Sequence, residues 1–87
     1  MATLKGFRPL RTIAAEISSD WVRPHYGAVP YIAAMATLTT MSDTYGMDDA
    51  PGIVAYFLTN ARTWKGDVAR RVKTELKAML KSEGIIA

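Results

Sequence analysis

The chain has 87 residues, of which 49% are apolar and 22% are charged, and its formal net charge is +3 at pH 7. This length fits one small domain and excludes the large nucleotide-binding enzyme folds. The apolar content is that of a globular protein and not of a disordered one. The sequence has no cysteine and one histidine, His25, which excludes disulfides, thiolate metal sites, cysteine nucleophiles and His-rich zinc clusters. We therefore expect no cofactor and no metal.

The sequence shows neither a secretory signal nor a membrane span. Residues 24–42 are free of Lys, Arg, Asp and Glu, but they include His25, Pro30 and several Ser and Thr positions. A helix needs about 20 mainly apolar residues to cross a bilayer, and this stretch is not apolar enough. We expect a cytoplasmic protein with no membrane partner.

The first half of the chain predicts two helices, over residues 9–22 and 28–42. In the first helix Pro9 suits the first turn, and Pro24 stops propagation beyond Arg23. One apolar stripe at helical spacing comprises Leu10, Ile13, Ala14, Ile17 and Trp21. The second helix has no ionisable side chain except Tyr31, which is typical of a central helix.

The second half predicts helices over residues 50–62 and 66–82. Asp48 or Asp49 can cap the third helix, and Pro51 suits its first turn. The last helix has the clearest amphipathic pattern in the chain, and Gly84 is expected to end it. Its apolar stripe comprises Val68, Val72, Leu76, Met79 and Leu80. No segment alternates apolar and polar residues as a half-exposed strand does.

These patterns predict an all-α fold: a single compact domain of four helices, with the helices over 28–42 and 50–62 in the interior. The other two helices each lay one apolar face against that pair. By their spacing, most of the tyrosines and both tryptophans are interpreted as core residues. A homodimer, in which each copy covers part of the apolar surface of the other, is also compatible with the sequence.

The candidate functional site is the basic outer face of the last helix. Arg70, Lys73, Lys77 and Lys81 fall within about 80° of one another around the helix axis, opposite the apolar stripe. Residues 62–81 hold seven Lys or Arg and two acidic residues, a local formal charge of +5. The predicted binding residues are Arg62, Lys65, Arg70, Arg71, Lys73, Lys77 and Lys81. The simpler interpretation is a solvated helix surface whose dipole favours cations near its C-terminus.

Two classes of partner suit such a face: an acidic surface of another protein, which we favour, and nucleic acid bound through its phosphates with little sequence preference. Trp64 lies between Arg62 and Lys65, a composition used for base stacking, although packing over the helix junction explains it equally well. A helix-turn-helix is disfavoured because Asp67 and Val68 stand where base contacts would be made. The last helix also has no Asn or Gln.

Enzymatic activity is not predicted. His25 can titrate near neutral pH, but no second catalytic group is apparent, and residues 18–25 lack the strand–turn–helix elbow of a hydrolase nucleophile. Asp43, Asp48 and Asp49 do not have the spacing of a calcium-binding loop. Helix capping is the simpler interpretation of the last two.

Residues 56–77, YFLTNARTWKGDVARRVKTELK, resemble a pattern, YFLxNAxxWxGxxAxxxKxELK, found in small uncharacterised all-α proteins of phages, plasmids and other mobile elements. A weaker similarity extends back to Trp21. The resemblance implies no activity for any residue. It implies a setting, because short, cysteine-free proteins of mobile elements often act by occluding a host complex, as anti-CRISPR proteins do.

Overall fold

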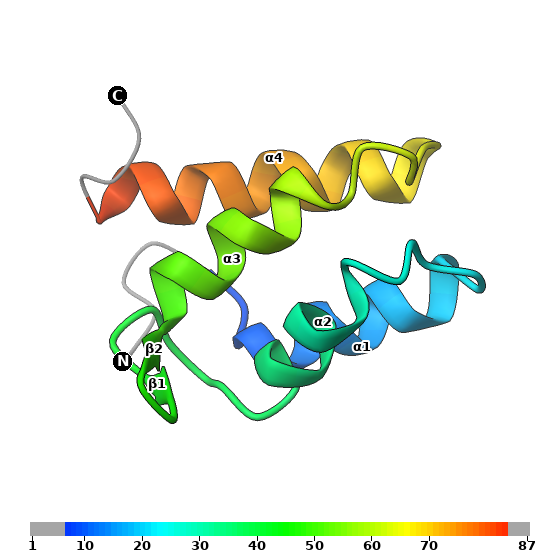
Figure 1. Cartoon of the computed structure of the whole chain (residues 1–87). Coiled ribbons are helices and arrows are strands. Elements are labelled where there is room, and N and C mark those ends of the chain that lie inside the picture. Colours follow the sequence, from blue (N-terminus) through cyan, green and yellow to red (C-terminus); the bar gives the residue numbers. More distant parts are fainter. Residues whose placement is uncertain (1–6, 84–87) are drawn as a thin grey trace.

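The computed structural model describes residues 7–83, in which four helices surround one apolar core and a short hairpin precedes the third helix (Figure 1). The helices are α1 (Leu10–Asp20), α2 (Val29–Met35), α3 (Ala50–Thr59) and α4 (Asp67–Ser82). The hairpin pairs β1 (Thr44–Tyr45) with β2 (Asp48–Asp49) in antiparallel register. The described chain is therefore mostly helical, as predicted, with one small β element that was not predicted.

Helix α1 confirms the predicted amphipathic stripe. All five stripe residues, from Leu10 to Trp21, are buried. The helix begins directly after Pro9 and ends at Asp20, and the backbone N–H of Trp21 donates to the carbonyl of Ile17 as the last helical bond. The proline start and the apolar spacing thus place this helix within two residues of its predicted bounds.

Helix α2 is much shorter than the predicted 28–42, because it ends at Met35. The carbonyls of Leu38 and Thr39 accept hydrogen bonds from the N–H groups of Arg11 and Leu10, at 2.8 and 3.0 Å. The first N–H groups of a helix have no partner inside it, so the chain after α2 leaves the helical path to cap α1. The early end of α2 could not be predicted from residues near Met35, because it depends on a contact with a segment that is distant in the chain.

The hairpin follows this capping segment. Gly46 adopts a φ of +63° in the two-residue turn between the strands, a conformation that favours glycine. Each strand has only two residues, too few for an alternating pattern to reveal it. Asp49 ends β2 and caps α3, because its Oδ1 accepts a hydrogen bond from the N–H of Gly52 at 2.8 Å. The predicted aspartate cap is therefore confirmed at Asp49.

Helix α4 lies within one residue of its predicted bounds. Its stripe faces the core, with Val72, Leu76, Met79 and Leu80 buried. Glu83 follows the last helical residue; the predicted end at Gly84 lies outside the described residues. Helix α3 ends at Thr59, three residues before the predicted 62.

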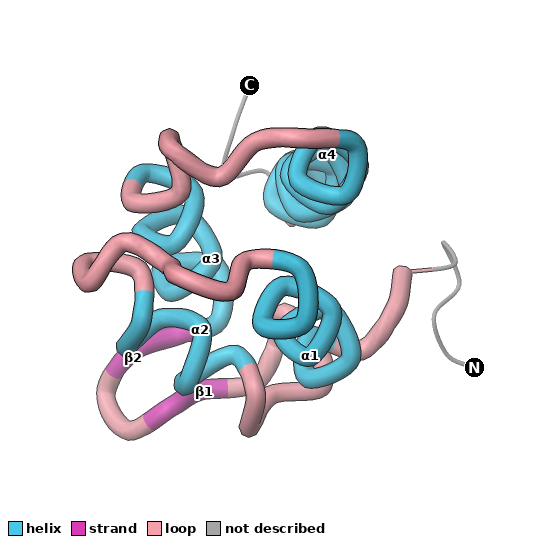
Figure 2. The backbone as a smooth tube through the Cα atoms, turned by 90° about the vertical axis from the view of Figure 1, so that its right-hand side faces the viewer, coloured by secondary structure: helices cyan, strands magenta, loops and turns pink. Residues whose placement is uncertain are grey.

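All four helices contribute buried side chains to the core, and α2 is not wholly in the interior as predicted. Helix α2 packs between α1 and α3, and α4 packs against α1 and α3 (Figure 2). Val29 and Ala33 on α2 are exposed, whereas Phe57 on α3 is fully buried. In such an arrangement each helix buries one face, so the uncharged outer face of α2 remains in contact with solvent. No helix within residues 7–83 combines the length and apolar character of a membrane span.

Candidate functional site

The predicted basic residues form a partly exposed surface on α4 and on the connection before it. Lys77 and Lys81 are exposed on the outer side of α4, and Arg62 and Lys65 are exposed in the connection from α3. None of these four makes an ion pair with a carboxylate of residues 7–83. We call this set, with Arg70, the basic face.

Arg70 belongs to the basic face despite having a partner. Its guanidinium lies 3.3 Å from Asp67 Oδ1, and the two side chains are 76% and 96% exposed. Such a solvent-exposed pair contributes little to stability and is readily exchanged. Arg70 is therefore available to another anion.

Arg71 does not belong to the basic face, although its position in the helix suggested that it would. It forms an ion pair with Glu16 of α1, which also pairs with Arg8 at 2.8 Å. Arg8 in turn pairs with Glu75 of α4 at 2.7 Å. Hydrogen bonds from Arg71 and then Arg8 hold the pKa of Glu16 below its ordinary value, and the bond to Glu75 raises the pKa of Arg8. This network joins α1 to α4.

Lys73 is half-buried, which its place opposite the apolar stripe did not predict. Its Nζ donates a hydrogen bond to the carbonyl of Trp64 at 2.6 Å and lies 6.0 Å from the centre of the Trp64 ring system. Burial lowers the pKa of Lys73, and the ammonium groups of Lys77 and Lys65 lower it further. The charges of Lys65 and Lys77 therefore act on Lys73, and we call these three residues the lysine cluster.

Trp64 is a structural residue and is not available for base stacking. Its side chain is only 2% exposed. The indole stacks on Trp21 with ring centres 5.6 Å apart and meets Phe57 edge-on. Its Nε1 donates to Asp20 Oδ2 at 2.8 Å. The interpretation of Trp64 as a residue packed over the helix junction is confirmed.

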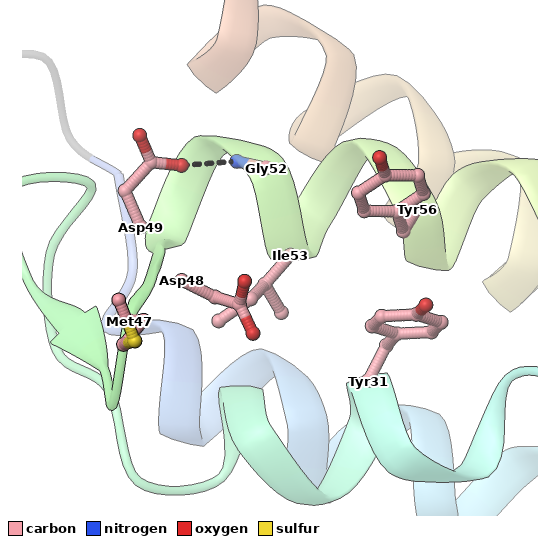
Figure 3. Close-up of a pocket in the computed structure, with 7 residues that line it drawn as sticks. All are labelled: Tyr31, Met47, Asp48, Asp49, Gly52, Ile53 and Tyr56. Carbon is pink, nitrogen blue, oxygen red and sulfur yellow. Dashed lines mark hydrogen bonds between the residues drawn. The ribbon is translucent and has the colours of Figure 1, made fainter.

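A second surface, which the sequence did not predict, lies between the hairpin, α2 and α3. Tyr31 and Tyr56 stack there with ring centres 5.6 Å apart and ring planes 22° apart. They border a cleft of about 270 Å³ (Figure 3). The other lining residues are Met47, Asp48, Asp49, Gly52 and Ile53. Helical spacing shows on which face of α2 Tyr31 lies and on which face of α3 Tyr56 lies. It does not show that these two faces meet.

Several tyrosines interpreted as core residues are exposed. Tyr26 is 84% exposed, Tyr56 is 60% exposed and Tyr45 is 47% exposed. The buried aromatic rings are those of Phe57, Trp21 and Trp64. Tyr56 lies beside the cleft, and Tyr26 packs against His25.

The remaining polar candidates do not converge on a reactive site. His25 is exposed and packs edge-on against the Tyr26 ring. The Asp43 carboxylate accepts hydrogen bonds from the N–H groups of Thr39 and Thr40, at 2.8 and 3.0 Å, and the bond from Thr40 contributes most to lowering its pKa. Within residues 7–83 no three His, Asp or Glu side chains come close enough to hold a metal ion.

Charge is segregated between the two surfaces. Residues 24–61, which form α2, the hairpin and α3, contain three Asp and no Lys or Arg, whereas residues 62–81 carry a formal charge of +5. The hairpin and α4 lie at opposite ends of the fold in both views (Figures 1 and 2). The chain matches no protein-family model, no curated protein and no solved structure.

Proposed function

We propose that this protein is a non-catalytic binding protein that docks its basic face on an acidic surface of another protein. The basic face is the observation that carries the proposal. Its residues Arg62, Lys65, Lys77 and Lys81 are exposed, and none of them pairs with a carboxylate of residues 7–83. An acidic partner would neutralise these charges, and the basic face would steer its approach.

Two features favour an acidic protein over nucleic acid. The burial of Trp64 means that the aromatic side chain between Arg62 and Lys65 cannot stack on an unpaired base. The ion pair of Arg71 with Glu16 and the hydrogen bond of Lys73 to a backbone carbonyl also reduce the number of cations that can each neutralise one phosphate. The exposed cations that remain would contact carboxylates on the surface of the partner protein. They are Arg62, Lys65, Arg70, Lys77 and Lys81.

Nucleic acid is the second candidate partner, and the formal charge of +5 over residues 62–81 favours it. The same basic face would contact phosphates without reading bases, because α4 has no Asn or Gln. In the narrower form of the first proposal, suggested by the resemblance of residues 56–77 to proteins of mobile elements, the protein inhibits a host complex by occluding an acidic surface, as anti-CRISPR proteins do.

A paired charge-reversal experiment tests the proposal. The variant Lys77→Glu/Lys81→Glu changes the basic face, and Arg11→Glu/Arg23→Glu makes the same change in net charge on exposed positions outside it. Thermal melting first establishes that both variants fold. We expect the α4 variant alone to lose its protein partners in pull-downs from a host lysate. Retention of the same partners by both variants would show that the basic face is not the interface.

A salt series distinguishes the two candidate partners. Fluorescence anisotropy with labelled duplex and single-stranded DNA is measured from about 50 to 200 mM salt, over which phosphate-mediated affinity falls steeply. Binding of several unrelated sequences with such a fall would favour nucleic acid. The first proposal predicts no DNA binding at about 50 mM salt.

A further inference from the structure

We propose that the cleft between the hairpin, α2 and α3 binds an arginine side chain presented by a basic segment of a partner protein. This site is separate from the basic face, and it would give the protein a second contact of opposite charge.

The size of the cleft suits one long side chain. Its volume is about 270 Å³, below the range of about 300–1,000 Å³ typical of pockets for small-molecule ligands. Figure 3 shows Ile53 and the stacked rings of Tyr31 and Tyr56 along the cleft, with the Asp48 carboxylate turned toward it. The methylene groups of an arginine would lie against this apolar lining, and its guanidinium would reach the carboxylate.

Charge complementarity identifies the occupant as a cation. The Asp48 carboxylate forms no hydrogen bond or ion pair with any side chain of residues 7–83, whereas Asp49 is already engaged by the N–H of Gly52. Residues 24–61 offer no Lys or Arg of their own. A basic partner segment would therefore meet a surface that attracts it and has no cation to repel it.

The aromatic lining favours arginine over lysine or a metal ion. A guanidinium is planar, stacks on tyrosine rings and can bind a carboxylate with two parallel hydrogen bonds. The ammonium group of lysine is a strongly hydrated point charge that gains less from such a surface. A divalent cation needs several oxygen ligands, and Asp48 supplies the only carboxylate here that is not already hydrogen-bonded within residues 7–83.

Exposed methionine and tyrosine side chains at the cleft are typical of a protein interface. Met47 and Tyr56 line the cleft, and they are fully exposed and 60% exposed. Methionine and tyrosine are enriched in interfaces, and tyrosine and arginine often account for much of the binding energy. A partner segment that inserts an arginine into the cleft would cover these side chains at its rim.

The test is an NMR titration of the full chain with the peptide Gly-Ser-Gly-Arg-Gly-Ser-Gly and with its citrulline analogue, a neutral isostere. We expect the arginine peptide to shift the ring resonances of Tyr31 and Tyr56 and the amide resonances of residues 47–53. The citrulline peptide should bind about threefold to fivefold more weakly, as expected for one exposed ion pair. Equal binding of the two peptides, or shifts only elsewhere on the protein, would overturn the proposal.

Three variants sharpen the test. Asp48→Asn should weaken binding of the arginine peptide about threefold to fivefold, and Tyr56→Leu, which keeps apolar volume but removes the ring, should weaken it to a similar extent. Asp67→Asn is the matched control, because Asp67 is also an exposed aspartate but lies on α4. An equal effect of Asp67→Asn would refute the assignment to the cleft.

Two further measurements separate this site from the basic face and from a dimer interface. The α4 variant Lys77→Glu/Lys81→Glu should bind the arginine peptide as the unmodified chain does, so that failure of the basic face and failure of the cleft are distinguishable. Sedimentation equilibrium should show no self-association that depends on Asp48. A dimer dissociated by Asp48→Asn would assign the cleft to a second copy of this chain and would overturn the proposal.

Discussion

The indole Nε1 of Trp64 donates a hydrogen bond to Asp20 Oδ2 across 44 positions of the chain, at 2.8 Å. Asp20 is the last residue of α1, and Trp64 lies in the connection that leads into α4. Stacking of the indole on Trp21, with ring planes 11° apart, reinforces the same contact. The end of α1 therefore holds the segment from which α4 begins.

Replacement of Trp64 tests this contact. Trp64→Phe removes the N–H donor and part of the buried ring, and we expect it to lower the free energy of unfolding by about 1–3 kcal/mol in urea denaturation. Asp20→Asn keeps an oxygen acceptor and should cost less than about 1 kcal/mol. A Trp64→Phe protein as stable as the unmodified chain would show that the contact does not hold the connection.

The network of Arg8, Glu16, Arg71 and Glu75 predicts a loss of stability in acid. The pKa of Glu16 is held below its ordinary value of 4.5 in the folded chain, so its ion pairs stabilise the fold above that pH. The contribution is lost as the pH falls from about 4.5 through the lower folded value. The free energy of unfolding, measured by denaturation at several pH values in this range, should fall less steeply with decreasing pH for Glu16→Gln than for the unmodified chain. Glu83→Gln, an exposed carboxylate without an ion pair among residues 7–83, is the control and should leave the slope unchanged.

The lysine cluster predicts a coupled titration. Burial and then the charges of Lys77 and Lys65 lower the pKa of Lys73 below its ordinary value of 10.5. Removal of one neighbouring charge by Lys77→Gln should therefore raise the pKa of Lys73, which is measurable from the ¹³Cε chemical shift during a pH titration. Bound polyglutamate should raise it as well, because an anion favours the charged form. If Lys77→Gln leaves this pKa unchanged, the two ammonium groups are not close in solution.

The backbone conformation of Gly66 predicts that a larger residue at this position would destabilise the fold without any steric clash of its side chain. It adopts φ +111° and ψ −179° before α4, a region open almost only to glycine, and a Cβ there would meet no atom within 4 Å. Gly66→Ala should lower the free energy of unfolding by about 1–3 kcal/mol. Gly46→Asn is the control, because Gly46 at φ +63° occupies a left-handed conformation that asparagine tolerates. Thermal melting would contradict this account if both variants lost the same stability.

Features that depend on near neighbours in the chain could be predicted from the amino-acid sequence. The apolar spacing of α1 and α4 predicts both helices within about two residues, because a helix face is set by positions three and four residues apart. The cap at Asp49 follows from the same locality, since its carboxylate reaches the N–H of Gly52 within one turn.

Which of these local features are available for function depends on contacts between segments that are distant in the chain. Helix α2 ends early because Leu38 and Thr39 cap a helix that begins some 28 residues earlier in the chain. Arg71 leaves the basic face because Glu16 faces it from α1, and Tyr31 and Tyr56 form a cleft because α2 packs beside α3. The spacing of residues along one helix shows which side chains lie on the same face of that helix. It does not show which charged or aromatic side chains of another helix will contact that face.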